Sequence, residues 1–164
     1  MNPARPVRTA IRQLNPTCYL VTSESSRRTA EVAAAAARAG AGIVQVRAKD
    51  LSAAGLLELT LAVAGAVERA NTATRVVVDD RCDIAFAAMR VGAHVHGVHL
   101  GQEDLPVADA RALLGPQAVI GLTTGTLELV RGAQAVADLI DYVGAGPFRP
   151  TPTKDSGRPA LGVE

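Results

Sequence analysis

The sequence predicts an α/β protein built around parallel strands, and three observations predict it. Six short runs of apolar or β-branched residues recur along the chain, and each is followed by a polar, charged or glycine-rich turn. The segments between them carry helical patterns. The 164 residues, 48% apolar and 20% charged, fit one globular domain. Strands that alternate with helices favour a parallel sheet with right-handed crossovers.

The predicted strands are nearly all apolar, as expected for strands that are covered on both faces. They span residues 18–22, 42–47, 75–79, 97–101, 118–122 and 141–144.

Five helices are predicted between the strands. They span residues 26–39, 52–70, 83–91, 106–114 and 127–137. Ser26 and Ser52 are candidate N-caps, because a serine side chain can accept from the free backbone N–H groups of a first helical turn. Pro106 fits a first helical turn, and Gly40 and Gly115 fit helix ends.

Two architectures share this pattern, an open doubly wound sheet and a closed (β/α)8 barrel. Both place ligands at the carboxyl ends of the strands. Eight units of about 25 residues need roughly 200 residues, and this chain supplies six units. The pattern therefore predicts either an open sheet or an incomplete barrel, with no linker that would divide it.

Composition excludes several function classes. The 17 basic and 16 acidic side chains nearly cancel, and aromatic residues make up 2%, which disfavours binding to nucleic acid. No segment predicts a membrane span or a secretory signal, and two cysteines make no disulfide framework. We therefore expect a cytoplasmic protein. Among 17 cations only Lys49 and Lys154 are lysines, which indicates either sites that need a point charge or chance at this small count.

Polar side chains follow the second predicted strand. Alternation places Gln45, Arg47 and Lys49 on one side of the chain. An amide, a guanidinium and an ammonium that point together suit a phosphorylated heterocycle. The alternative is a solvated strand end.

Acidic side chains follow the third and fourth strands. Asp79 and Asp80 lie at one strand end, and Asp104 lies after the next. Carboxylates with phosphate and water are typical ligands of Mg²⁺, so these residues predict a magnesium site. The alternative is that Asp83 and Asp104 are helix N-caps.

Further hydroxyls and histidines occur near the later strands. Thr123 follows the fifth strand with Thr124, and the loop after the sixth offers an anion the donors Thr151, Thr153 and Lys154. His94, His96 and His99 have a spacing that can bind zinc, but they lack an evident fourth ligand, which favours neutral histidines packed beside a strand. No pairing of a nucleophile with a base is visible.

Six stretches, in this order, resemble the thiamine-phosphate synthase family. They are Tyr19–Thr22, Gln45–Asp50, Val78–Arg81, Gly97–Asp104, Ile120–Thr123 and Asp141–Lys154. The resemblance implies a TIM barrel, present here as about six βα units over 18–164 after an N-terminal extension, 1–17. It also implies a transferase that joins a pyrimidine diphosphate to a thiazole phosphate, releasing diphosphate and giving thiamine monophosphate.

The resemblance also implies roles for the polar residues. The pyrimidine diphosphate would be bound by Gln45, Arg47, Lys49, Asp79 and Thr123, and Mg²⁺ by Asp80 and Asp104. The thiazole phosphate or departing diphosphate would be bound by Thr151, Thr153 and Lys154. The family's reaction is dissociative, so Arg47, Lys49 and Lys154 would act electrostatically and no residue as nucleophile or base.

The sequence departs from the family pattern at three places, one of which is a stretch, Met89–His96, that is longer than the family's usual spacing before Gly97. Asp79 stands where the family usually has Asn, which adds a charge and removes an amide donor. The family also continues through two more βα units, so we expect a fragment that is inactive alone. The alternatives to a synthase are a thiazole tautomerase-like protein and an inactive ligand-binding fragment.

Overall fold

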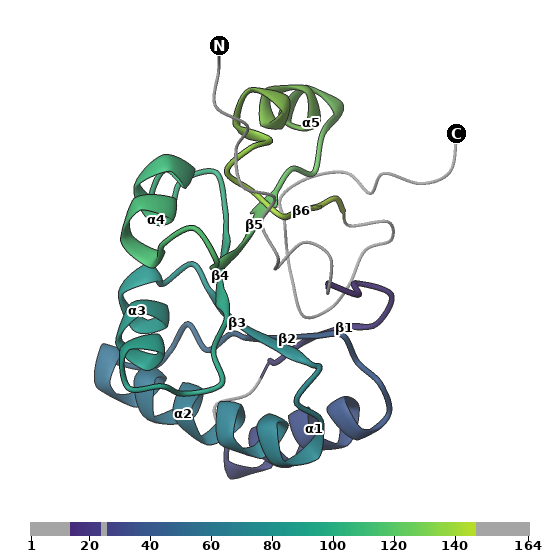
Figure 1. Cartoon of the computed structure of the whole chain (residues 1–164), viewed down its shortest axis with the longest axis vertical. Coiled ribbons are helices and arrows are strands. Elements are labelled where there is room, and N and C mark those ends of the chain that lie inside the picture. Colours follow the sequence, from purple (N-terminus) through teal and green to yellow (C-terminus); the bar gives the residue numbers. More distant parts are fainter. Residues whose placement is uncertain (1–13, 24–25, 147–164) are drawn as a thin grey trace.

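The computed structural model describes residues 14–23 and 26–146 and contains six parallel strands in one sheet (Figure 1). The elements in chain order are β1 (Tyr19–Val21), α1 (Arg27–Arg38), β2 (Ile43–Val46), α2 (Ala53–Ala70), β3 (Arg75–Asp79), α3 (Cys82–Arg90), β4 (Gly97–Leu100), α4 (Val107–Leu114), β5 (Val119–Thr123), α5 (Leu127–Ala133), the 3₁₀ helix η2 (Gln134–Val136) and β6 (Tyr142–Gly144). Every predicted strand and helix is present, within a few residues of its predicted ends, except that the last predicted helix divides into α5 and η2.

The sheet is a curled half-barrel, which confirms the barrel-type prediction. Its strand order is β1-β2-β3-β4-β5-β6, so strands that follow one another in sequence are hydrogen-bonded neighbours. A doubly wound sheet requires a reversal of strand order, and this sheet has none. Figure 1 shows the strands arranged along a curve, with helices α1 to α4 on its outer side.

The outer face of the sheet forms the main core. Residues such as Val44, Val76 and Val98 are fully buried there against the helices. Helix α2 contributes Leu56 and Val63 from its inward face. This apolar face explains why the strand predictions were accurate, since period and composition both indicated burial.

The inner face carries a smaller apolar layer. Ile43, Val77 and Val119 are buried there, and Tyr19 and Tyr142 pack against them. These five side chains come from five different strands. They form a floor beneath the polar residues at the carboxyl ends of the strands.

Two glycines allow close packing on the inner face of the sheet. A side chain at Gly97 would collide with the backbone of Val119, and one at Gly121 would collide with Tyr142 and His99. The absence of a Cβ at Gly121 therefore lets the Tyr142 ring lie across β5.

The predicted caps are partly confirmed. Ser52 Oγ accepts from Gly55 N at 3.2 Å, and Ser26 is the N-cap of α1. Pro106 precedes α4 as its N-cap rather than lying in the first turn, and Gly115 ends that helix with a φ of +86°. No helix in the described part of the chain is long and apolar enough to cross a membrane.

Candidate active site

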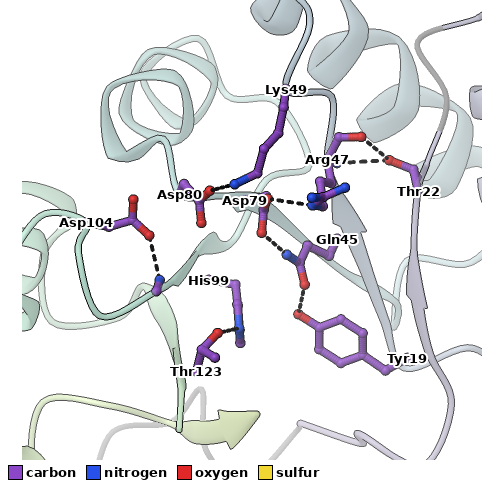
Figure 2. A network of polar contacts seen from close by, with 11 residues as sticks. Tyr19, Thr22, Gln45, Arg47, Lys49, Asp79, Asp80, His99, Asp104 and Thr123 are labelled. Atoms are coloured by element: carbon purple, nitrogen blue, oxygen red, sulfur yellow. Dashed lines mark hydrogen bonds and ion pairs between the residues drawn. The ribbon is translucent and has the colours of Figure 1, made fainter. Parts of the chain in front are cut away.

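Polar side chains from five strand ends meet at one rim of the sheet (Figure 2). The rim forms because all the strands run parallel, so their carboxyl ends lie at the same edge. Its residues are Thr22 after β1; Gln45, Arg47 and Lys49 from β2 and its following loop; Asp79 and Asp80 at β3; His99 in β4 and Asp104 after it; and Thr123 in β5.

Asp79 is the acceptor for two residues of the β2 end. Its Oδ1 accepts from the Gln45 amide, and its Oδ2 lies 3.3 Å from Arg47 Nε. Thr22 fixes the backbone beside them, because its Oγ1 accepts from Arg47 N at 2.9 Å. The structure thus brings Gln45 and Arg47 together, and it pairs them with a carboxylate of the neighbouring strand.

The pKa of Asp79 is raised to about 6, chiefly by burial and next by the neighbouring charge of Asp80. The cations Arg47 and Lys49 and the Gln45 hydrogen bond act in the opposite direction. Burial outweighs these partners because it removes water from the carboxylate, which costs more than an incomplete ion pair returns.

Lys49 pairs with Asp80. Its Nζ lies 2.9 Å from Asp80 Oδ2, and this hydrogen bond raises the pKa of Lys49. The Lys49 side chain is 59% exposed, so it is free to turn toward a bound anion at little cost.

Asp80 has a left-handed backbone, with a φ of +60°, and is the one non-glycine residue with positive φ in the described ranges. Its N–H donates to His99 O at 2.8 Å, which anchors the turn to β4. Backbone strain of this kind costs on the order of 1–3 kcal/mol and gathers at functional sites.

Asp104 lies beside Asp80. Its Oδ2 accepts from Gly101 N at 2.6 Å. Partial burial raises the pKa of Asp104, and the adjoining Asp80 carboxyl raises it further, while Gly101 N–H and Lys49 lower it. The neighbouring Asp80 carboxyl thus disfavours the charged form of Asp104, and a cation bound beside them would relieve this effect.

Asp83 and Asp104 are not the helix caps that the alternative interpretation required. Arg81 is the N-cap residue of α3 and Pro106 that of α4. Asp83 instead pairs with Arg81, 2.8 Å from its Nε. The described residues contain no group of three or more His, Cys, Asp or Glu side chains placed to hold a metal ion.

A second layer of polar contacts lies deeper in the curl of the sheet. Tyr19 Oη donates to Gln45 Oε1 at 2.7 Å and lies 2.8 Å from Tyr142 Oη. His99 connects Tyr142 with Thr123, through Nδ1 at 3.0 Å and Nε2 at 2.9 Å respectively. These contacts join the two sides of the rim.

Sequence reasoning missed Tyr19 and Tyr142 and did not assign His99 to the site. A signal existed, since the chain has only two tyrosines and both fall within predicted strands. Their proximity depends on the register of strands more than a hundred residues apart, which the sequence alone does not provide.

Other candidates lie elsewhere. Thr124 is buried and donates to Gly144 O at 3.2 Å, so it joins β5 to β6. His94 contacts Thr74 O at 2.9 Å, and His96 Nδ1 accepts from Val76 N at 3.1 Å. Both histidines are packed beside strands, as predicted. Three further candidates lie outside the described residues: Thr151, Thr153 and Lys154.

The chain matches the sequence profile described as thiamine monophosphate synthase over residues 18–164. It belongs to this family. Its curated relatives include the thiamine-phosphate synthases of Corynebacterium jeikeium, 59% identical over 90% of this chain, and of Corynebacterium efficiens, 57% identical over 90%. The chain spans about two thirds (67%) of the length of each.

Solved structures agree with this assignment. The thiamine phosphate pyrophosphorylase from Pyrococcus furiosus superposes with a TM-score of 0.67 at 29% identity, over 87% of this chain and 65% of that one. A sialic acid aldolase from Ruminococcus gnavus superposes with a TM-score of 0.57 at 15% identity, over 77% and 43% of the two chains, which shows a shared fold alone. The family that the six sequence stretches indicated is therefore confirmed.

Proposed function

We propose that the rim catalyses the family's transfer reaction in thiamine biosynthesis. The substrates are 4-amino-2-methyl-5-(diphosphooxymethyl)pyrimidine and a thiazole phosphate, and the products are thiamine monophosphate and diphosphate. The observation that carries this proposal is the gathering of two cations, an amide and three carboxylates at one rim, in a chain 59% identical to a thiamine-phosphate synthase.

Arg47 and Lys49 are proposed to bind the diphosphate. Both already point to the rim, where Asp79 and Asp80 hold them. An incoming diphosphate replaces Asp80 as the partner of the exposed Lys49, while Arg47 stays against Asp79. Gln45, Asp79 and Thr123 are proposed to contact the pyrimidine part. The predicted roles of Thr151, Thr153 and Lys154 toward phosphate remain part of the proposal.

Asp80 and Asp104 fit a divalent cation. Their carboxyls adjoin, and Lys49 forms an ion pair with Asp80. Together with Asp79 and Arg47, the described rim has three carboxylates and two cations, so a bound divalent cation would offset the excess of negative charge. Two carboxylates, completed by phosphate and water, are a typical Mg²⁺ donor set. When bound, Mg²⁺ would neutralise charge on the diphosphate.

The proposed reaction needs no protein nucleophile. The bond between the pyrimidine methylene carbon and the diphosphate oxygen breaks, and its electron pair leaves with diphosphate. The thiazole nitrogen then donates its lone pair to the resulting carbocation. The protein contributes positioning, exclusion of water, and cationic stabilisation of the leaving group by Arg47 and Lys49.

A cytoplasmic location belongs to this proposal. It is supported by the chemistry of the substrates, because phosphorylated compounds are charged and costly to move through a bilayer.

The test is an assay of the 164-residue protein with both substrates and Mg²⁺, following diphosphate and thiamine monophosphate. Under this proposal we expect both products, a result that would overturn the sequence-based expectation that the six-unit chain is inactive alone. We also expect loss of both products with a chelator, and a fall of at least about 100-fold for Asp80→Asn, the magnitude typical of removing one charged contact from a transition state. Asp83→Asn, on an exposed carboxylate beyond the rim, is the matched control and keeps the rate.

Other outcomes of this assay would contradict the synthase proposal. Interconversion of thiazole isomers without coupling would indicate a tautomerase. Calorimetric binding of the pyrimidine diphosphate without turnover would indicate a ligand-binding protein.

A further inference from the structure

We propose that Asp79 sets the tautomer of His99 through a chain of hydrogen bonds inside the sheet, and so decides whether Thr123 faces a substrate as an acceptor or a donor. His99 lies on β4 and Thr123 on β5. In Figure 2 the Asp79 side chain contacts Gln45 and Arg47, not His99 or Thr123. Asp79 is thus a positioning residue in this proposal. The influence on substrate recognition rests on the proposed function, whereas the tautomer itself does not.

The contacts are continuous from one end to the other. Asp79 Oδ1 meets the Gln45 amide, Gln45 Oε1 meets Tyr19 Oη at 2.7 Å, and the two tyrosine oxygens lie 2.8 Å apart. Tyr142 Oη then meets His99 Nδ1 at 3.0 Å. His99 Nε2 meets Thr123 Oγ1 at 2.9 Å. Heavy-atom positions alone leave the hydrogens of the last three contacts undetermined.

The direction is set at Asp79. An ionised carboxylate only accepts hydrogen bonds, and Arg47, which contacts the second oxygen, only donates. Gln45 must therefore present its NH₂ group to Asp79. Its carbonyl oxygen is then turned to Tyr19 and can only accept, so the Tyr19 hydroxyl donates to Gln45.

Each phenol has one hydrogen to give. Burial raises the pKa of both Tyr19 and Tyr142, so both stay protonated. The Tyr19 hydroxyl already donates its hydrogen to Gln45, so the Tyr142 hydroxyl must donate to Tyr19 Oη across the 2.8 Å contact. Tyr142 then has none left for His99, and His99 Nδ1 must carry the hydrogen and donate.

The series of hydrogen bonds ends at Thr123. A neutral imidazole with hydrogen on Nδ1 has a bare Nε2, which accepts from the Thr123 hydroxyl. Thr123 Oγ1 then has only lone pairs left for other partners. Under the proposed function it suits an N–H donor, such as the exocyclic amino group of an aminopyrimidine, better than a phosphate oxygen.

An asparagine at position 79 reverses the direction of every hydrogen bond in this series, and the heavy-atom change this needs is a flip of the Gln45 amide. Because Arg47 only donates, the asparagine keeps its oxygen toward Arg47 and turns its NH₂ group to Gln45. The Gln45 amide then rotates, both phenols donate in the opposite direction, and His99 carries its hydrogen on Nε2. His99 Nε2 then donates to Thr123 Oγ1, so the Thr123 hydroxyl can donate its own hydrogen to another partner.

The test is a two-bond ¹H–¹⁵N spectrum of protein labelled at histidine, recorded without substrate at alkaline pH, where the imidazoles are neutral. The other two histidines serve as internal references. His94 Nε2 must donate because it faces a carbonyl oxygen, and His96 Nδ1 must accept because it faces a backbone N–H. We expect two Nε2–H tautomers and one Nδ1–H tautomer, the latter absent from His99→Gln.

Variants separate the chain from other effects. Asp79→Asn is expected to convert the His99 pattern to Nε2–H, with the His94 and His96 signals unchanged as evidence of folding. Asp80→Asn removes the neighbouring charge but no link, so it must leave the tautomer as it is. Tyr19→Phe interrupts the series of hydrogen bonds between Asp79 and His99. Adding Asp79→Asn to this variant must therefore leave the His99 tautomer unchanged.

Three results would overturn the inference. These are an Nε2–H tautomer of His99 in the unaltered protein, an unchanged His99 in Asp79→Asn, and a His99 that responds equally to Asp80→Asn. Because no substrate enters the spectrum, failure here is distinct from failure of the synthase assay.

Discussion

At Asp80, a left-handed backbone and a carboxylate that is proposed to bind Mg²⁺ occupy the same residue. The φ of +60° is expected to cost about 1 kcal/mol in a residue with a Cβ. The Lys49 contact returns little, because the lysine is mostly exposed. Asp80 therefore lowers stability, which is the pattern expected of a residue that binds ligand.

Glycine and alanine at position 80 separate strain from charge. Both Asp80→Gly and Asp80→Ala remove the carboxylate, but only glycine accepts the left-handed backbone freely. We expect the glycine variant to be about 1 kcal/mol more stable than the alanine variant in urea unfolding, with synthase activity lost in both. Equal stability of the two variants would show that the backbone is not strained.

His96 makes stability depend on pH. The pKa of His96 is lowered to about 4, chiefly by burial and also by the nearby His94 and Arg75, whereas the unfolded value is 6.5. Between these values the unfolded chain binds more protons, so stability falls as the pH drops from 6.5 toward 4. The contribution is fully present above 6.5.

The variant His96→Asn tests this dependence, because its Oδ1 can still accept from Val76 N. We expect the wild type to lose up to about 3 kcal/mol more than this variant between pH 7.5 and pH 4, measured by urea unfolding. Asp79, whose pKa is raised, adds the opposite slope in both proteins and cancels in the comparison. Parallel pH curves for the two proteins would contradict the prediction.

At the scale of the element, the sequence predicted strands and helices well for a physical reason. The strands are covered on both faces, so their composition alone marks them, as the buried run Val76–Val78 illustrates. The division of the last predicted helix into α5 and η2 escaped prediction. That segment buries few apolar side chains, so its sequence has little pattern to show.

The site was predictable only in its local part. Alternation along one strand placed Gln45, Arg47 and Lys49 together, and the structure brings them to one rim. The carboxylate partners of these residues, and the contact of Tyr19 with Tyr142, depend on which strands are neighbours and in what register. Such information becomes available only once the curl of the sheet is known.

Strand β5 offers a test of how closely the inner face is packed. A methyl group at Gly121 would collide with Tyr142 and His99, so Gly121→Ala must displace the tyrosine or the strand. We expect a loss of about 1–3 kcal/mol in urea unfolding. Gly132→Ala in α5 is the control, because its new Cβ would meet nothing within 4 Å and a helix gains stability from alanine. A neutral Gly121→Ala would show that the inner layer has free space.

At the scale of the whole molecule, burial is uneven along the curl. Strands β3 and β4 lie in the middle of the sheet and pair on both sides, and six of their nine residues are buried while the other three are half-buried. Helices α5 and η2, beside β6, contribute Ala133 as their buried residue. Near that end Asp141 anchors the chain, accepting from Ile120 N at 2.8 Å and pairing with Arg111 at 3.0 Å.

This gradient predicts the order of local opening in the native protein. Amides open locally at a cost that rises with the buried apolar surface and hydrogen bonding around them. We therefore expect hydrogen exchange, followed by mass spectrometry, to be slowest in peptides from β3 and β4 and fastest in those from α5 and η2. The amide of Ile120 in β5 is expected to exchange more slowly than the amides of α5, because it donates to the buried carboxylate of Asp141. Exchange from α5 that is as slow as from β3 would contradict this order, and would mean that the curled sheet opens as a single cooperative unit.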